Sequence, residues 1–290
     1  MQSLLKLLGF LMLSGATWGS LATPLKSHFF LTSDGVELHY LEAGQAHQTI
    51  VFIPGWLMPA AIFENQLAEL SKNYRVLALD PRSQGQSELT TKSHAPQRRI
   101  DDIREFLVAA KVEEFVLAGW SLGVLEVLDY LANHQPTGLK GLILIDNSVG
   151  EGRPPQPRGS NLRDSLNNPV KRETYLREFS QGMFKQPPPS DMMTAVLESV
   201  LRVPSPVALQ LINQPYPREH WRDTLAKQLV PVLYAIRPRF KDQAESLLNK
   251  RPTELIEIQV FEIAGHALFV DDAGRFNSAV RTFCQKAFAR

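Results

Sequence analysis

Short apolar runs alternate with amphipathic stretches along most of this chain, and this alternation predicts strands and helices that follow one another in turn. The amphipathic stretches have apolar residues at helical spacing, as at Ile100, Ile103 and Phe106. Mostly apolar runs predict strands at 29–31, 36–41, 49–53, 74–79, 115–118, 142–145, 231–236 and 256–263. Apolar strands joined by helices predict an α/β fold with a mostly parallel central sheet and helices on both faces.

The pattern changes between residues 149 and 230. Proline, glycine and arginine are frequent at 150–159, and proline clusters at 187–189 and 204–206 break the rest into short helical pieces. This composition predicts an inserted helical lid over 149–230. The core domain is then expected to comprise 23–148 and 231–290, with a last helix at about 273–287.

The N-terminus has the features of a secretory signal. Lys6 precedes an apolar stretch at 7–18, and small residues at Ser20 and Ala22 fit a cleavage site. We therefore expect a signal peptide at 1–22 and a periplasmic or secreted protein, with an uncleaved anchor as the alternative. The apolar stretch is short for a membrane-spanning helix, so no stable membrane insertion is expected after cleavage. Cys284 is the single cysteine and cannot form an internal disulfide.

Composition narrows the classes of partner. The chain has 290 residues and a net charge of +1, which gives no reason to expect nucleic acid. The sequence has no phosphate-binding glycine loop, dinucleotide fingerprint or Cys/His cluster with metal spacing. We expect a small-molecule substrate and neither a cofactor nor a metal. The sequence does not predict the oligomeric state.

The segment Gly119-Trp120-Ser121-Leu122-Gly123 carries the strongest chemical signal. It follows the apolar run 115–118 and precedes leucines at helical spacing, so it lies where a strand turns sharply into a helix. A serine on such a turn projects from the fold as a nucleophile, and glycines on both sides avoid collisions with neighbouring elements. Ser121 is therefore the predicted nucleophile. The alternative is a serine that only caps the helix.

A serine hydroxyl needs a base that accepts its proton. Three histidines follow Ser121 in the chain. His134 would lie about 20 Å along the elbow helix, and His220 lies in the predicted lid. His266 follows a strand and has a glycine before it and apolar residues after it. His266 is the predicted base.

The acid that orients the histidine has two candidates. Asp146 directly follows the strand at 142–145, next to the elbow strand, whereas Asp242 lies several residues beyond the strand at 231–236. Asp146 is preferred because ligand sites in parallel sheets form at the carboxyl ends of strands. Asp242 is kept as the alternative acid. The backbone N–H groups of Leu122 and Trp56 are the predicted oxyanion donors.

Several of these segments together resemble the α/β-hydrolase family. They are Pro54-Gly55-Trp56, the run Asp80-Pro81-Arg82-Ser83-Gln84-Gly85-Gln86-Ser87, the elbow, and Gly265-His266-Ala267-Leu268-Phe269. The chain is similar to lidded carboxylesterases and cofactor-free haloperoxidase-type enzymes over nearly all of its length after residue 22. The resemblance implies an α/β-hydrolase fold, a Ser-His-Asp triad, an acyl-enzyme and no cofactor. Relatives usually carry the triad aspartate after the strand that matches 231–236, where this chain has Arg237-Pro238-Arg239.

These expectations combine into a serine hydrolase that cleaves a carboxylic ester. An amide, lactone or carbon–carbon bond hydrolase, a perhydrolase and a binding protein without catalysis remain alternatives. We expect Arg237 and Arg239 to be solvated surface residues, with attraction of an anionic substrate as the other interpretation.

Overall fold

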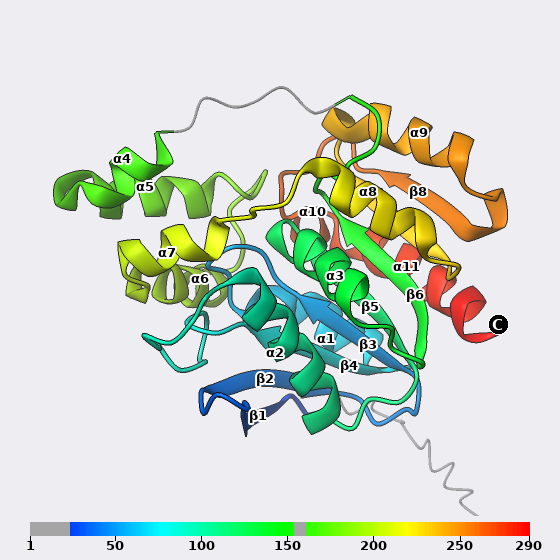
Figure 1. Cartoon of the computed structure of the whole chain (residues 1–290), viewed down its shortest axis with the longest axis horizontal. Coiled ribbons are helices and arrows are strands. Elements are labelled where there is room, and N and C mark those ends of the chain that lie inside the picture. The colour runs from blue at the N-terminus through cyan, green and yellow to red at the C-terminus, as the bar shows by residue number, and fades with distance from the viewer. Residues whose placement is uncertain (1–23, 154–160) are drawn as a thin grey trace, which may run out of the picture.

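The computed structural model describes residues 24–153 and 161–290. The predicted signal peptide at 1–22 and part of the predicted lid, 154–160, lie outside the described residues. Eight strands of the described chain form one sheet in the order β1-β2-β4-β3-β5-β6-β7-β8 (Figure 1). Their bounds are β1 Lys26–Leu31, β2 Glu37–Ala43, β3 Thr49–Ile53, β4 Arg75–Asp80, β5 Phe115–Trp120, β6 Leu139–Ile145, β7 Val232–Ile236 and β8 Ile256–Val260.

The sheet is antiparallel only at one side, where β2 pairs with β1 and with β4. The six strands from β4 to β8 run parallel. At the carboxyl ends, Trp120 is in register with Ile145, and Ile145 is in register with Ala235. The residues that follow β5, β6 and β7 therefore meet at one edge of the sheet. The predicted mostly parallel α/β architecture is confirmed.

Helices cover both faces of this sheet, as predicted. The apolar side chains of α2, α3, α8 and α9 share one core cluster with one face of the strands, and those of α1, α10 and α11 share the other. In Figure 1, α2 and α3 cross in front of the sheet. The bounds are α1 Glu64–Leu70, α2 Pro96–Ala109, α3 Leu122–Asn133, α9 Lys241–Lys250, α10 Leu268–Asp271 and α11 Ala273–Phe288, with short 3₁₀ turns at Ala60–Phe63, Pro238–Phe240 and Thr253–Leu255.

Five helices lie between β6 and β7, in the region where a helical insertion was predicted. They are α4 Leu162–Asn167, α5 Pro169–Gln181, α6 Ser190–Arg202, α7 Ser205–Ile212 and α8 Arg218–Lys227. Helices α4 to α7 gather beyond one end of the sheet, at the left of Figure 1. Helix α8 differs from them because Trp221 and Leu225 pack into the core cluster beneath α3. We call α4 to α7 the cap.

The strands β1 and β6 begin three residues before the predicted positions, at Lys26 and Leu139, and two further local features differ from the predicted elements. The predicted helix at 61–70 begins with a 3₁₀ turn, and β8 ends at Val260 rather than 263. The strand ends early because the Phe261 N–H makes its last bond to Ile236 O, at 2.7 Å, before the chain turns toward His266. None of the described helices is long and apolar enough by itself to cross a membrane. Helices α6 and α7 pass that test only as a pair, bent by 102°.

Candidate active site

Ser121 lies on a strained turn between β5 and α3. Its backbone has φ 55° and ψ −121°, a conformation that non-glycine residues rarely adopt. A Cβ at Gly119 would lie 2.4 Å from the carbonyl oxygen of Gly123, and one at Gly123 would lie 2.3 Å from that of Ile53. Glycine is therefore required on both sides of the serine. The turn has the strand–turn–helix form that the sequence predicted.

The structure brings His266 and Asp146 to this serine. The Ser121 Oγ lies 2.8 Å from His266 Nε2, and His266 Nδ1 lies 2.6 Å from Asp146 Oδ2. His266 stands between β8 and α10, and its carbonyl oxygen accepts a 2.9 Å hydrogen bond from the buried Trp120 indole. Asp146 directly follows β6, and its side chain is fully buried. Three residues from distant segments thus form one continuous series of hydrogen bonds.

The other candidates lie elsewhere. Asp242 is in the first turn of α9, has a half-exposed side chain and pairs with Arg153 at 3.0 Å. His134 lies 3.4 Å from Asp101, and His220 Nε2 lies 2.9 Å from Asp129 Oδ1. Of the two acids left open by the sequence, the geometry therefore favours Asp146.

Arg237 is a component of this site that the sequence interpretation placed wrongly at the solvated surface. Its side chain is only 16% exposed, and its Nε donates to Asp146 Oδ2 at 2.6 Å. Its backbone N–H donates to Asp146 Oδ1 at 2.9 Å. The signal that could have found it is its position directly after β7, the strand next to the one that presents Asp146.

These contacts set the charge states in the site. Burial by itself would raise the pKa of Asp146, but the hydrogen bond from His266 and the charge of Arg237 lower that pKa below its ordinary value. Asp146 is therefore a carboxylate, and the proton between it and His266 belongs to Nδ1. Burial also lowers the pKa of His266, with Asp146 opposing this and Arg237 and Arg239 adding to it. The imidazole is thus neutral at pH 7, with Nε2 free to accept the serine proton.

Asn147 was not found from the sequence. Its side-chain amide donates to the backbone carbonyl oxygen of Ser121 at 2.7 Å. Its backbone carbonyl oxygen accepts a 2.7 Å hydrogen bond from the Tyr234 hydroxyl. Asn147 thereby connects the strained turn to β6 and β7. No local pattern marks this residue, because its partner lies 26 positions earlier in the chain.

Trp56 and Leu122, the predicted oxyanion donors, both lie beside Ser121 at the wall of one cavity. Leu122 is the first residue of α3, and Trp56 follows β3 in a loop that comes close to the serine. A Cβ on the neighbouring Gly55 would lie 3.0 Å from the Ser121 Cβ. The Trp56 indole donates to the carbonyl oxygen of Ala208 in α7 at 2.8 Å and packs edge-on against Phe179 of α5. This loop is therefore attached to the cap.

A cavity of about 290 Å³ opens above Ser121. Its walls come from the sheet edge and from the cap, and most of the lining side chains are apolar: Trp56, Met58, Trp120, Leu122, Leu125, Phe179, Met183 and Ile212. The volume is at the low end of the range for ligand sites. The cavity fits a small, largely apolar group.

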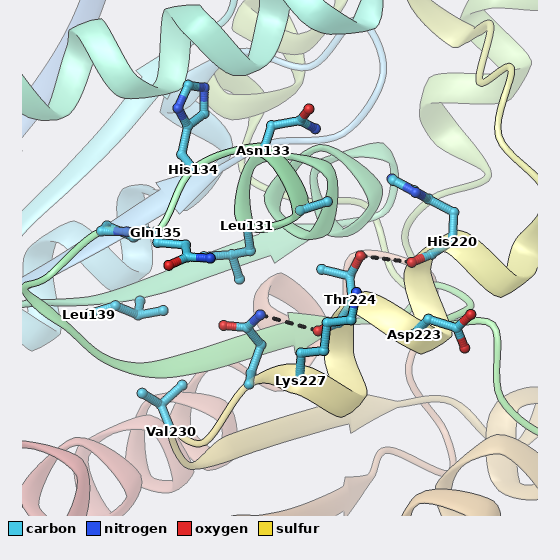
Figure 2. Close-up of a pocket in the computed structure, with 13 residues that line it drawn as sticks. Leu131, Asn133, His134, Gln135, Leu139, His220, Asp223, Thr224, Lys227 and Val230 are labelled. Carbon is cyan, nitrogen blue, oxygen red and sulfur yellow. Dashed lines mark hydrogen bonds between the residues drawn. The ribbon is translucent and has the colours of Figure 1, made fainter.

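A larger cavity, about 730 Å³, lies elsewhere in the described residues, between the end of α3 and α8 (Figure 2). Its one hydroxyl, on Thr224, donates to the carbonyl oxygen of His220 at 2.7 Å. Its lining residues present no nucleophile in contact with a base. We therefore place the candidate site at the smaller cavity.

A second Ser–His–Asp contact shows that these distances alone do not make a nucleophile. Ser27 Oγ lies 2.7 Å from His39 Nε2, and His39 Nδ1 lies 2.7 Å from Asp80 Oδ2. Ser27 lies within the extended edge strand β1, and it lines neither the cavity above Ser121 nor the one between α3 and α8. Asp80 also accepts hydrogen bonds from the backbone of Ala60 and Gln86, so this group holds loops in place.

No group of three or more His, Cys, Asp or Glu side chains in residues 24–153 and 161–290 is arranged to hold a metal ion. We assign no residue to cofactor binding.

Comparisons with known proteins identify the family of this chain. Residues 50–279 match the model of the alpha/beta hydrolase family. The chain is 25% identical over 274 residues to the AB hydrolase superfamily protein YisY of Bacillus subtilis, which covers 88% of this chain and 98% of that protein. A non-heme chloroperoxidase of Burkholderia pyrrocinia is 34% identical over 124 residues, 42% of this chain and 45% of that protein.

Among solved structures, the esterase RhEst1 from a Rhodococcus species superposes with a TM-score of 0.74 at 25% identity and covers 90% of this chain and 99% of its own. The family model spans most of the chain. This chain therefore belongs to the alpha/beta hydrolase family.

Proposed function

We propose that this protein is a serine hydrolase that cleaves a carboxylic ester of a small molecule through Ser121, His266 and Asp146. The observation that carries the proposal is the series of contacts at 2.8 and 2.6 Å that joins these side chains beneath an apolar cavity. Solved structures of similar fold include proteins named as esterases.

The proposed reaction has two steps. Ser121 Oγ attacks the acyl carbon as His266 Nε2 takes its proton, and the oxyanion collapses as the alcohol leaves with that proton. An acyl-enzyme on Ser121 results. Water then attacks the acyl carbon, its proton passes to Nε2, and Ser121 leaves with that proton as the acid product forms. Asp146 keeps the proton of His266 on Nδ1 and stabilises the imidazolium.

The developing oxyanion needs fixed donors. We assign the backbone N–H groups of Leu122 and Trp56 to this role. Support comes from the position of Leu122 at the start of α3, where backbone N–H groups have no partner within the helix. The assignment of the Trp56 N–H is supported by the close approach of its loop to Ser121.

The cap contributes the outer wall of the cavity and excludes water from the acyl-enzyme. The volume of about 290 Å³ and the apolar walls favour a short acyl or aryl group. We also propose that residues 1–22 direct the protein to the periplasm or outside the cell, on the signal-like pattern of that segment.

A binding protein without catalysis was an alternative because relatives usually place the acid after the strand that matches β7. The contact of Asp146 with His266 from the end of β6 supports catalysis over this alternative. Perhydrolysis by the same residues remains a second candidate, favoured by the haloperoxidase names among the relatives.

Labelling with a fluorophosphonate probe tests the proposal. The wild-type protein should form one covalent adduct, found by mass spectrometry on Ser121, and Ser121→Ala should form none. Ser27→Ala is the matched control, because Ser27 also contacts a histidine but should not react. Absence of an adduct on well-folded wild-type protein would refute the proposal. Turnover of nitrophenyl esters with short and long acyl chains, with and without peroxide, then separates the substrate classes.

A further inference from the structure

We propose that Arg237 is a positioning residue of this active site, which fixes the Asp146 carboxylate and offsets its negative charge beside His266. The inference rests on the proposed function, because it assigns Arg237 a part in preparing the base. Arg237 stands directly after β7, at the place where the family resemblance leads one to expect the acid itself. The charge at this place is therefore opposite to the expected one.

Two separate donors of Arg237 bind the two carboxylate oxygens. The backbone N–H binds Oδ1 at 2.9 Å, and the side-chain Nε binds Oδ2 at 2.6 Å. Two contacts from one residue fix the plane of the carboxylate as well as its position. Because the Asp146 side chain is fully buried, water does not compete for these oxygens. The orientation of Oδ2 toward His266 Nδ1 thus depends on Arg237.

A third contact concerns the ring itself. Arg237 Nη2 lies 3.2 Å from His266 Nδ1. A guanidinium group only donates, and Nδ1 at 2.6 Å from a carboxylate carries its own proton. The two nitrogens are therefore both donors, so this contact is not a hydrogen bond in the reactive tautomer. It brings a positive charge next to a ring that becomes positive during the reaction.

The charged groups around His266 come from three places. Asp146 faces Nδ1 from the end of β6, Arg237 faces the same atom from the end of β7, and Arg239 contributes from the 3₁₀ turn that follows. On the other side, Nε2 faces the neutral Ser121 hydroxyl. Burial and the two arginines lower the pKa of His266, whereas Asp146 raises it. Arg237 therefore shifts protonation of the ring toward lower pH, so that more of the ring stays neutral as the solution becomes acidic.

The test uses two variants. Arg237→Gln removes the positive charge. Arg237→Lys keeps the charge, but its side chain has only the terminal Nζ and no nitrogen that corresponds to Nε of arginine. The midpoint of His266 protonation is measured by NMR of isotope-labelled histidine, with His266→Gln to assign the signal. The rate of fluorophosphonate labelling at Ser121 is measured over the same pH range. A purely structural role for Arg237 would change stability and rate but would leave the midpoint in place.

We expect Arg237→Gln to raise the midpoint by about one pH unit, a tenfold change in proton affinity. Its labelling rate at pH 5.5 should fall several-fold more than its rate at pH 8. Arg237→Lys should keep the midpoint close to that of the wild type and label more slowly at every pH.

An unchanged midpoint in folded Arg237→Gln overturns the electrostatic part of the inference. If that variant does not fold, a wild-type labelling rate in Arg237→Lys overturns the positioning part. The NMR midpoint does not require turnover, so failure of the inference can be told apart from failure of Ser121 to react.

Discussion

Gly123 lies in the first turn of α3, where this helix passes closest to the loop after β3. A Cβ at this position would lie 2.3 Å from the carbonyl oxygen of Ile53 and 2.7 Å from that of Pro54. Both neighbours are backbone atoms, so neither can turn aside as a flexible side chain could. The helix and the loop that carries Trp56 would have to separate.

We therefore expect Gly123→Ala to lower the free energy of unfolding by about 3 kcal/mol, the upper end of the usual cost of overpacking a core. Gly274→Ala in α11 is the matched control, because a Cβ there meets nothing within 4 Å. It should leave stability unchanged or raise it by less than about 1 kcal/mol. Urea unfolding of the two variants measures both values, and equal stabilities would contradict this account of the elbow.

The choice between the two candidate acids can be tested at the same scale. Asp146→Asn should leave the fold intact and lower kcat about 10³- to 10⁴-fold, because the amide no longer holds the histidine in its reactive tautomer. Asp242→Asn removes only a half-exposed partner of Arg153 and should change kcat by less than about twofold. Ester hydrolysis by the two variants decides the matter, and a reversed order of effects would assign the acid to Asp242.

At the scale of elements, the cap and the loop after β3 are joined through α6. The Ser199 Oγ donates to the carbonyl oxygen of Leu57 at 2.7 Å and accepts from the Gly85 N–H at 2.8 Å. Ser199 is 2% exposed, so water cannot easily replace either bond. One hydroxyl thus connects the cap to two core loops, one of which carries Trp56.

Ser199→Ala should lower the free energy of unfolding by about 1–3 kcal/mol, because a backbone N–H and a carbonyl lose their partner in a buried place. It should also slow fluorophosphonate labelling of Ser121 several-fold, since the Trp56 loop loses a support. The control is Thr194→Ala in the same helix, whose exposed hydroxyl bonds only within α6. That variant should stay within about 0.5 kcal/mol of the wild type. Similar stability and labelling in the two variants would show that Ser199 does not support the loop.

Elements with a strong local pattern could be predicted, and contacts between distant elements could not. The elbow at Ser121 has its strand, glycines and helix within a few residues, so its form followed from the sequence. The contact of Arg237 with Asp146 depends on β6 and β7 lying side by side, because the two residues are 91 positions apart in the sequence. An arginine next to a proline gives no local sign of such a contact. For the same reason the sequence left Asp146 and Asp242 both open.

At the scale of the whole molecule, the shape of the cavity follows from how the cap packs on the core. Phe179, Met183 and Ile212 come from the inserted region and meet Trp56 and Leu125 of the core at the cavity wall. Sequence indicated the insertion but not which of its side chains face Ser121, because that depends on the packing of several short helices. Substrate size is therefore a property of the assembled fold rather than of any motif.

The dependence of the free energy of unfolding on pH is also a property of the whole chain. We expect His94 to contribute to the loss of stability in acid. His94 is 2% exposed, and its Nε2 lies 2.9 Å from the Ser83 Oγ. Burial, with the nearby charges of Arg82 and Arg99, lowers the pKa of His94 to about 4. In the unfolded chain the pKa of a histidine is about 6.5. Between these values the unfolded chain binds more protons, so the free energy of unfolding must fall as pH decreases from about 6.5 to 4.

The loss should reach a few kcal/mol across that window, since one pKa unit corresponds to about 1.4 kcal/mol. His94→Gln removes this titration and should flatten the dependence of stability on pH between about 7 and 5. Part of the slope should remain, because the pKa of His266 is lowered as well. His47→Gln is the control, since it replaces a histidine whose side chain is mostly exposed. Urea unfolding at pH 7, 6 and 5 measures each slope. A full wild-type slope in His94→Gln would mean that other groups cause the acid sensitivity, because a residue that cannot take up a proton cannot contribute to the linkage.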